Sequence, residues 1–181
     1  FFQRAEADHH LDEFLNSDKS LLVLTGKAGT GKSSLICHFA THPPEGSVTW
    51  LQDCGSLDVD NNLAVHFMET LFLPAAPHRV FEHLFKNNPG VKFVAIFDAV
   101  NQYKDTRRLL SSIAELAELG QRFPNFKIIL TARLPVWSVL RLDFDFPAQA
   151  TYRPSGDDVV MDIFEENEVK EAYKGYQEAF E

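Results

Sequence analysis

Apolar and polar positions along the chain follow two alternating patterns: short continuous apolar runs, and longer stretches with apolar residues three or four positions apart. The first pattern predicts buried strands and the second predicts amphipathic helices. Strands are expected at about residues 20–25, 48–52, 91–97, 126–131 and 144–151. Helices are expected at about residues 6–15, 32–41, 62–73, 77–87, 105–120, 134–140, 157–164 and 168–180. The chain therefore alternates strand and helix along most of its length.

This alternation determines the expected fold class. Strands that alternate with helices predict a three-layer α/β sandwich with a mainly parallel five-stranded sheet, here followed by a helical C-terminal extension. Such sheets carry their functional sites beyond the carboxyl ends of the strands. We expect residues 1–153, including the N-terminal helix, to form the main domain. Residues 154–181 are expected to begin a helical subdomain or C-terminal helical extension.

A glycine-rich segment lies between the first expected strand and the helix that follows it. Residues 26–33 read Gly-Lys-Ala-Gly-Thr-Gly-Lys-Ser, which is the Walker A pattern in the strand–loop–helix context that a P-loop requires. Its glycines let the backbone curl so that many N–H donors face one anion, which the start of the next helix also attracts. The main domain is therefore expected to be a P-loop NTPase sandwich that binds nucleotide.

The residues of this loop have distinct expected roles. Lys32 should reach the β- and γ-phosphates of a triphosphate, and the Ser33 hydroxyl should bind Mg²⁺. The expected nucleotide-binding residues of the loop are Gly26, Ala28, Gly29, Thr30, Gly31, Lys32, Ser33 and Ser34.

Two further signals come at the ends of later strands. Asp98 closes the third expected strand, and an aspartate at that place in P-loop proteins holds Mg²⁺. Thr131 and Arg133 close the fourth. In a parallel sheet these two residues lie beside Asp98 and near the γ-phosphate, where an arginine can bind the terminal phosphate and change partner when it leaves. Lys32, Asp98 and Arg133 are therefore expected to be catalytic, and Ser33 and Asp98 to bind the metal.

Together these elements resemble the signal-transducing P-loop NTPases of the STAND class, of NACHT and NB-ARC type, over most of the chain. Residues 2–6 look like the family's opening segment, residues 26–33 like its Walker A motif and residues 93–102 like its Walker B segment. Residues 128–133 look like its sensor 1, and residues 152–164 like its link to a helical subdomain. In the opening segment Gln3 stands where glycine is usual. The resemblance implies ATP or ADP with Mg²⁺ as ligands, Arg4 near the adenine, a nucleotide-operated switch, and self-association through the full-length protein.

The Walker B segment departs from this family. NACHT-type proteins typically carry an acidic pair where this chain has Asn101 and Gln102, and NB-ARC proteins often carry an acid where it has Ala99. A carboxylate orients and deprotonates the attacking water, whereas an amide orients water without taking its proton. Gln102 is the candidate for positioning the water, and Asp53 and Asp105 are candidate substitute acids. Hydrolysis is therefore expected to be slow.

Other functions remain open beside the slow signalling switch. A conventional oligomeric ATPase motor or loader needs an efficient catalytic acid and an arginine that reaches across subunits, and the altered Walker B segment disfavours it. A small-molecule kinase needs an arginine-rich lid and an acceptor site, neither of which is evident. A nucleotide-binding scaffold without hydrolysis also fits Asn101 and Gln102. The absence of an Asn-Lys-x-Asp guanine motif favours ATP over GTP.

Composition narrows the partners and the compartment. The 181 residues carry a formal net charge of −9 without a lysine- or arginine-rich block, so no nucleic-acid surface is expected on this fragment. No apolar stretch approaches a membrane span and no signal peptide is visible, which favours a cytoplasmic protein without a membrane partner. Cys37 and Cys54 make no disulfide framework, and Cys37 is expected to be buried. The chain begins without methionine, and we expect it to be part of a longer protein.

Overall fold

The computed structural model describes residues 4–57, 66, 77–164, 166, 168–170, 173, 174 and 177. In chain order, its elements are α1 (Ala5–Asn16), β1 (Leu21–Gly26), α2 (Lys32–Thr41), β2 (Ser47–Asp53), α4 (Pro77–Asn87), β3 (Lys92–Asp98), the 3₁₀-helix η1 (Val100–Gln102), α5 (Thr106–Gln121), β4 (Phe126–Arg133), α6 (Leu134–Asp143), β5 (Thr151–Tyr152) and β6 (Val159–Met161).

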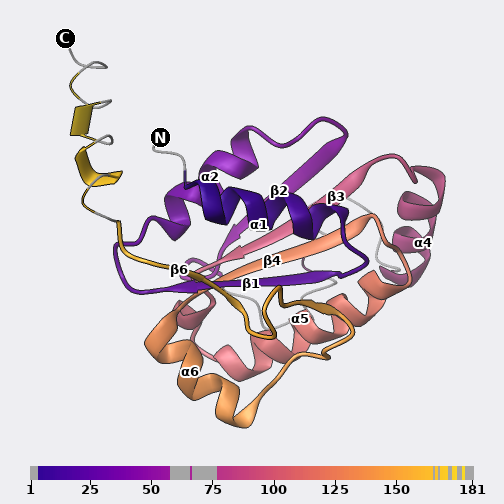
Figure 1. The fold of residues 1–181 in the computed structure, drawn as a ribbon. Helices are drawn as coiled ribbons and strands as arrows, with labels where there is room; N and C mark the ends of the chain where they lie inside the picture. The colour runs from indigo at the N-terminus through magenta and orange to yellow at the C-terminus, as the bar shows by residue number, and fades with distance from the viewer. Residues whose placement is uncertain are drawn as a thin grey trace.

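The strands form one sheet in the order β2-β3-β4-β1-β5, and β6 also pairs with β1. β4 lies between β1 and β3, so Gly26 is in register with Arg133 on one side, and Phe97 with Leu130 on the other. Every described pair of strands is parallel, and the carboxyl ends of β1, β3 and β4 therefore meet at one edge of the sheet (Figure 1). This edge is where the sequence places the candidate site residues.

Helices cover both faces of the sheet (Figure 1). On one face, α1 and α2 pack against alternate residues of the central strands, among them Leu22 and Ile129. On the other face, α5, α6 and Phe85 of α4 pack against the intervening residues, among them Leu21 and Ile128. Successive residues of a strand point to opposite faces, so continuous apolar runs such as that of β1 supply both cores at once.

The α/β sandwich with a mainly parallel sheet is confirmed. β1, β2, β3 and β4 occupy the four expected strand segments up to residue 131, and β4 runs on to Arg133. α1, α2, α4, α5 and α6 occupy the helical segments expected at those places. The helix expected at 62–73 lies outside the described residues except for residue 66, which is helical, and the described residues within 168–180 are helical as well.

Two expectations near the C-terminus are wrong. The strand expected over residues 144–151 is confined to the short β5, because the preceding chain turns so that the N–H groups of Ala150 and Thr151 donate to the Pro147 carbonyl. The helix expected over 157–164 contains β6 instead. Its β-branched Val159 and Val160 pair with β1 beyond the end of β5. Without this pairing, the buried backbone N–H and C=O groups at that edge of β1 would lack hydrogen-bond partners, which is costly.

The sheet consequently has six strands rather than the five expected. β6 belongs to the same sheet as β1 although it follows residue 153, and the division of the chain at that residue remains a prediction. Cys37, expected to be buried, is exposed, because α2 turns Leu35, Ile36 and Phe39 towards the core instead. Within the described residues, none of the helices has the length and apolar character needed to cross a membrane.

Candidate functional site

The Walker A segment forms the turn between β1 and α2. Gly29 and Gly31 have φ angles of 81° and 86°, a left-handed conformation that glycine adopts without a Cβ clash. Gly31 is the N-cap residue of α2, and the helix begins at Lys32 as expected. The first-turn N–H groups of α2 lack partners within the helix and, with the positive end of the helix dipole, create an anion-binding position at the loop.

Lys32 lies across this loop. Its Nζ donates to the carbonyls of Gly26 (3.0 Å) and Lys27 (2.7 Å) and to the Thr30 hydroxyl (3.2 Å). Burial lowers the pKa of Lys32, the nearby Asp98 carboxylate opposes that lowering, and the Arg133 guanidinium adds to it. Lys32 and Arg133 thus place two positive charges at the same site, which favours a polyanionic ligand.

A pocket of about 330 Å³ opens between the loop and the ends of β3 and β4. Gln102 and Arg133 line it from one side. From the other side it is lined by six of the expected loop residues: Ala28, Gly29, Gly31, Lys32, Ser33 and Ser34. The pocket also includes Ala99, Asn101, Thr131 and Ala132. Gly26 and Thr30 are buried and do not line the pocket; the Gly26 carbonyl accepts from Lys32, and the Thr30 carbonyl accepts from Arg4.

Asp98 is fixed at the end of β3 by the neighbouring strand. The Thr131 hydroxyl donates to Asp98 Oδ1 (2.5 Å) and accepts a hydrogen bond from the Ala99 N–H (2.9 Å). Ala99 has φ 55° and ψ 48°, a left-handed conformation that is uncommon for a residue other than glycine. The strand end therefore turns sharply after Asp98, and η1 then carries the next residues past the pocket.

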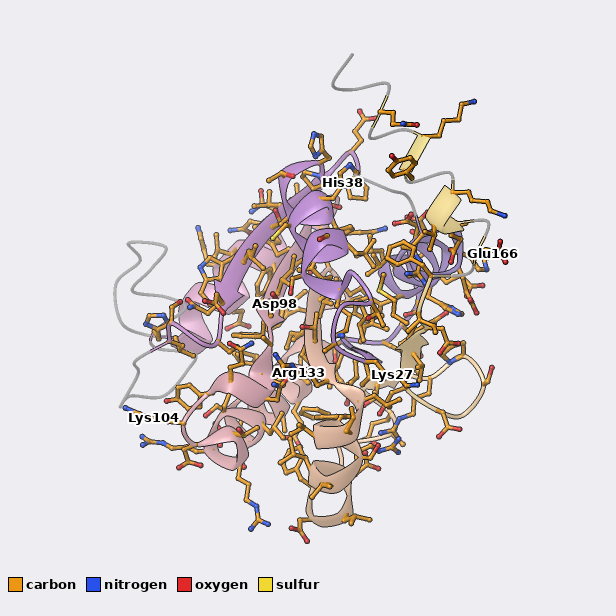
Figure 2. All side chains as sticks on the ribbon, turned by 90° about the vertical axis from the view of Figure 1, so that its left-hand side faces the viewer. Lys27, His38, Asp98, Lys104, Arg133 and Glu166 are labelled. Atoms are coloured by element: carbon orange, nitrogen blue, oxygen red, sulfur yellow. The ribbon has the colours of Figure 1, made fainter. Side chains whose placement is uncertain are left out.

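Asn101 and Arg133 are joined across this turn. The Asn101 Oδ1 accepts a hydrogen bond from the backbone N–H of Arg133 (3.0 Å), so the amide side chain ties η1 to the junction of β4 and α6. In Figure 2, the labelled residues Asp98 and Arg133 lie near one another. The parallel sheet thus places Arg133 beside the strand end of Asp98, as the sequence indicates.

Of the candidate substitute acids, Asp53 is in register with Asp98 at the ends of β2 and β3, and Asp105 precedes α5. Asp53 Oδ1 accepts from the Gly55 N–H (3.0 Å) in the turn after β2, and Asp105 Oδ1 accepts from the Arg108 N–H (3.1 Å) as the N-cap of α5. Neither aspartate is among the residues that line the pocket. Among the described residues, none that lines the pocket carries a carboxylate, but the Asp53 carboxylate is close to Gln102: a Cβ added at Gly55 would lie 2.7 Å from Gln102 Oε1 and 3.3 Å from Asp53 Oδ1.

A magnesium ion at this site would be held by oxygen ligands. The exposed Ser33 hydroxyl at the start of α2 and the half-buried Asp98 carboxylate at the end of β3 are hard oxygen donors of the type that Mg²⁺ prefers. The Thr131 hydrogen bond leaves the second carboxylate oxygen of Asp98 for a metal or a metal-bound water. The residues present therefore fit this ion.

Arg4 lies outside the pocket. It is buried and lines a separate cavity of about 220 Å³ beside α1 and β6. Its Nη1 donates to the Thr30 carbonyl (3.1 Å), so Arg4 contacts the Walker A loop from the side of β6. Its expected place near an adenine remains a prediction.

Three features of the site have little or no signal in the sequence. Ala99 is left-handed although alanine has no preference for that conformation, and Asn101 braces Arg133 across 32 positions. Arg4 reaches Asp162 across 158 positions. Such pairings depend on how the elements pack, which local periodicity does not encode.

Comparison with known proteins places the fold. No protein-family model matches the chain, and no curated protein matches it. Among solved structures, the Walker-type ATPase paby2304 of Pyrococcus abyssi has a TM-score of 0.62 and 22% identity, covering 99% of this chain and 59% of that one. Cdc6p of Pyrobaculum aerophilum has a TM-score of 0.66 and 11% identity, covering 97% and 48%. The Aeropyrum pernix ORC1 protein, solved in complex with DNA, has a TM-score of 0.57 and 12% identity, covering 99% and 50%.

These similarities extend over almost all of this chain, which spans about half to three fifths of the length of the three structures. At such identities they show the fold, that of Walker-type P-loop ATPases.

Proposed function

We propose that this chain is the ATP- and ADP-binding domain of a larger protein and works as a STAND-type signal-transduction switch with slow ATP hydrolysis. The observation that carries the proposal is the pocket in which Lys32, the start of α2 and Arg133 converge while amides take the places of a catalytic acid. The described residues of the pocket lining thus have cationic and N–H groups that bind phosphate, but no carboxylate that could deprotonate the attacking water.

The residues have separate roles in this proposal. The loop amides and Lys32 bind the phosphates, and Ser33 with Asp98 holds Mg²⁺, which when bound neutralises phosphate charge. Arg133 contacts the terminal phosphate, and Gln102 orients a water. Because Arg133 begins the turn into α6, the presence or loss of the γ-phosphate biases the arrangement of that segment.

The remaining expectations belong to the same proposal. Self-association takes place through the full-length protein, in the cytoplasm and without a nucleic-acid partner on this fragment. The net charge of −9 supports the last point, although structures similar to this chain, the Aeropyrum pernix ORC1 protein among them, were solved with DNA.

The second candidate is a conventional oligomeric ATPase. The similarity to a Walker-type ATPase, Cdc6p and ORC1 favours it at the level of the fold. The two proposals differ in turnover, because a motor or loader needs an efficient base. Turnover of this chain on the order of 1–10 per second would favour the motor and contradict the switch.

Nucleotide content and turnover test the proposal directly. The purified chain is denatured and any released nucleotide is identified by chromatography; ATP turnover and binding of a fluorescent ADP analogue are then measured. The control for Lys32→Ala is Lys27→Ala, which removes the same charge from an exposed position of the same loop. Bound ADP, slow turnover and loss of both with Lys32→Ala alone are expected. A folded protein that neither contains nor binds nucleotide would overturn the proposal.

A further inference from the structure

Arg4 joins the Walker A loop to the chain that follows β6. Its Nη1 donates to the Thr30 carbonyl (3.1 Å) and its Nη2 to the Asp162 carbonyl (2.9 Å). Its Nε lies 3.4 Å from Glu168 Oε1, and its Cζ lies 4.4 Å from the centre of the Phe164 ring. The guanidinium therefore bonds one partner on the loop and contacts three on the C-terminal side.

The chain around the end of β6 also touches the loop directly. Met161 is in register with Gly26, and a Cβ added at Gly26 would lie 2.4 Å from the Met161 carbonyl oxygen. A Cβ added at Gly31 would lie 3.6 Å from Met161 Cε and 3.7 Å from Phe164 Cζ. The first and last glycines of the loop are thus both covered by this segment, and at Gly26 only glycine allows the approach.

These contacts couple the loop to the segment. Arg4 is only 9% exposed, and a buried cation must keep its hydrogen-bonding and aromatic partners to offset desolvation. If the segment moved away, Arg4 would lose its contacts with Asp162, Phe164 and Glu168, and the Thr30 carbonyl alone would not compensate. Displacement of the segment therefore also frees the backbone at Thr30, next to the phosphate-binding residues.

We propose that Met161, Asp162, Phe164 and Glu168 form a strap that Arg4 fastens to the Walker A loop, and that the strap sets the rate at which nucleotide leaves. This regulation rests on the function proposed above. Figure 1 shows the described helical residues beyond the strap standing clear of the sandwich, on the side where α1 begins. When a force or a partner protein displaces that helical stretch, the strap opens, Arg4 transmits the change to the loop, and nucleotide exchange becomes faster.

Two variants of the strap test the proposal at residues that do not themselves line the pocket. Glu168→Gln removes the ion pair with Arg4, and Phe164→Leu removes the aromatic face beneath it. Glu166→Gln is the matched control, since it makes the same charge change on the same helical stretch at a residue that pairs with Lys170 (2.7 Å). Circular dichroism and thermal unfolding establish that each variant is folded.

The first readout is the release of a fluorescent ADP analogue, followed by stopped flow after mixing with excess unlabelled ADP. Release is expected to be about 3- to 10-fold faster in Glu168→Gln and in Phe164→Leu than in the wild type. Glu166→Gln is expected to release at the wild-type rate. Equal rates in the wild type and both strap variants would overturn the proposal.

The second readout needs no nucleotide. Hydrogen exchange of peptides covering residues 27–34 is expected to be faster in both strap variants than in the wild type and the Glu166→Gln control. Unchanged exchange would overturn the coupling between strap and loop. If the wild type bound no ADP analogue, the proposed function and the control of release would both fail, and the exchange data would separately decide whether the strap holds the loop.

Discussion

The hydroxyl of Thr131 lies 2.5 Å from Oδ1 of Asp98 and donates a hydrogen bond to it. The Thr131 hydroxyl oxygen also accepts a hydrogen bond from the Ala99 N–H (2.9 Å), so a single side chain of β4 orients the carboxylate at the end of β3 and holds the turn that follows it. Pairing of β3 with β4 brings the two strand ends together, and Thr131 converts that proximity into a fixed geometry. We infer that the orientation of the metal-binding carboxylate depends on Thr131.

Thr131→Val should therefore weaken Mg²⁺-dependent nucleotide binding more than Mg²⁺-independent binding. Valine keeps the shape of threonine but leaves Asp98 without a donor and Ala99 N–H without an acceptor, which should lower the free energy of unfolding by about 1–3 kcal/mol. Binding of an ADP analogue with Mg²⁺ and with EDTA, together with urea unfolding, measures both effects. Thr131→Ser retains the hydroxyl and serves as the control. An unchanged ratio of the two affinities in Thr131→Val would contradict the role.

Asn101→Asp or Gln102→Glu should raise ATP turnover. Aspartate at 101 keeps an oxygen for the Arg133 N–H while adding a carboxylate, and glutamate at 102 places one directly in the pocket lining. A positioned general base contributes on the order of 10²–10⁴ in rate, so a rise of roughly tenfold or more is expected from at least one variant.

Steady-state phosphate release measures this change, with Gln121→Glu on the exposed surface of α5 as a control for added charge. If neither variant exceeds the wild-type rate while both still bind ATP, the missing carboxylate is not what limits hydrolysis.

Ala99→Gly should not destabilise the protein. The left-handed conformation at φ 55° costs an alanine about 1–2 kcal/mol, and glycine avoids that cost while losing a similar or smaller amount through its more flexible unfolded chain. The free energy of unfolding in urea is expected to stay equal or to rise by up to about 1 kcal/mol. Ala114→Gly, in the middle of α5, is the control and should lower it by about 1 kcal/mol. Equal destabilisation by the two substitutions would show that residue 99 is not strained.

The sequence predicts best those parts of the molecule that neighbouring residues determine. The loop between Gly26 and Ser33 is specified by its own glycines, and the helical spacing of α5 by its own apolar residues, so both are found where expected. The rule that the carboxyl ends of parallel strands meet at one edge of the sheet was enough to predict that Asp98 and Arg133 lie close together. The catalytic and binding roles given to these residues remain predictions.

Pairings between distant segments account for what the sequence does not predict. The segment that contains β6 is acidic and has helical spacing, yet Val159 and Val160 become a strand because β1 has a free edge there. Arg4 was expected from the family resemblance to lie near an adenine, and its contacts with Asp162, Phe164 and Glu168 exist only once the two ends of the chain meet. Tertiary context overrides local preference in each case.

Lys127 provides the remaining prediction, which concerns stability against pH. It is 1% exposed at the start of β4, where its Nζ donates to the carbonyls of Ser17 (2.8 Å) and Lys19 (2.5 Å) and so ties the end of α1 to the sheet. Burial lowers the pKa of Lys127 to about 8, Lys92 adds to the lowering, and Asp18 opposes it.

In the unfolded chain the pKa of Lys127 returns to its ordinary value near 10.5. Between about pH 8 and pH 10.5 the unfolded state therefore binds more protons than the folded state, and the free energy of unfolding rises with pH. The cost of burying the charge is fully present below pH 8 and is relieved through this window by an amount of the order of 3 kcal/mol.

The side chain in Lys127→Met cannot titrate. Subtracting the unfolding free energy of this variant from that of the wild type therefore cancels the pH dependence that other titratable groups contribute to both proteins. Urea unfolding of both proteins from pH 7 to pH 10 should show this difference moving in favour of the wild type as pH rises. A difference that stays flat would mean that Lys127 keeps an ordinary pKa in the folded protein.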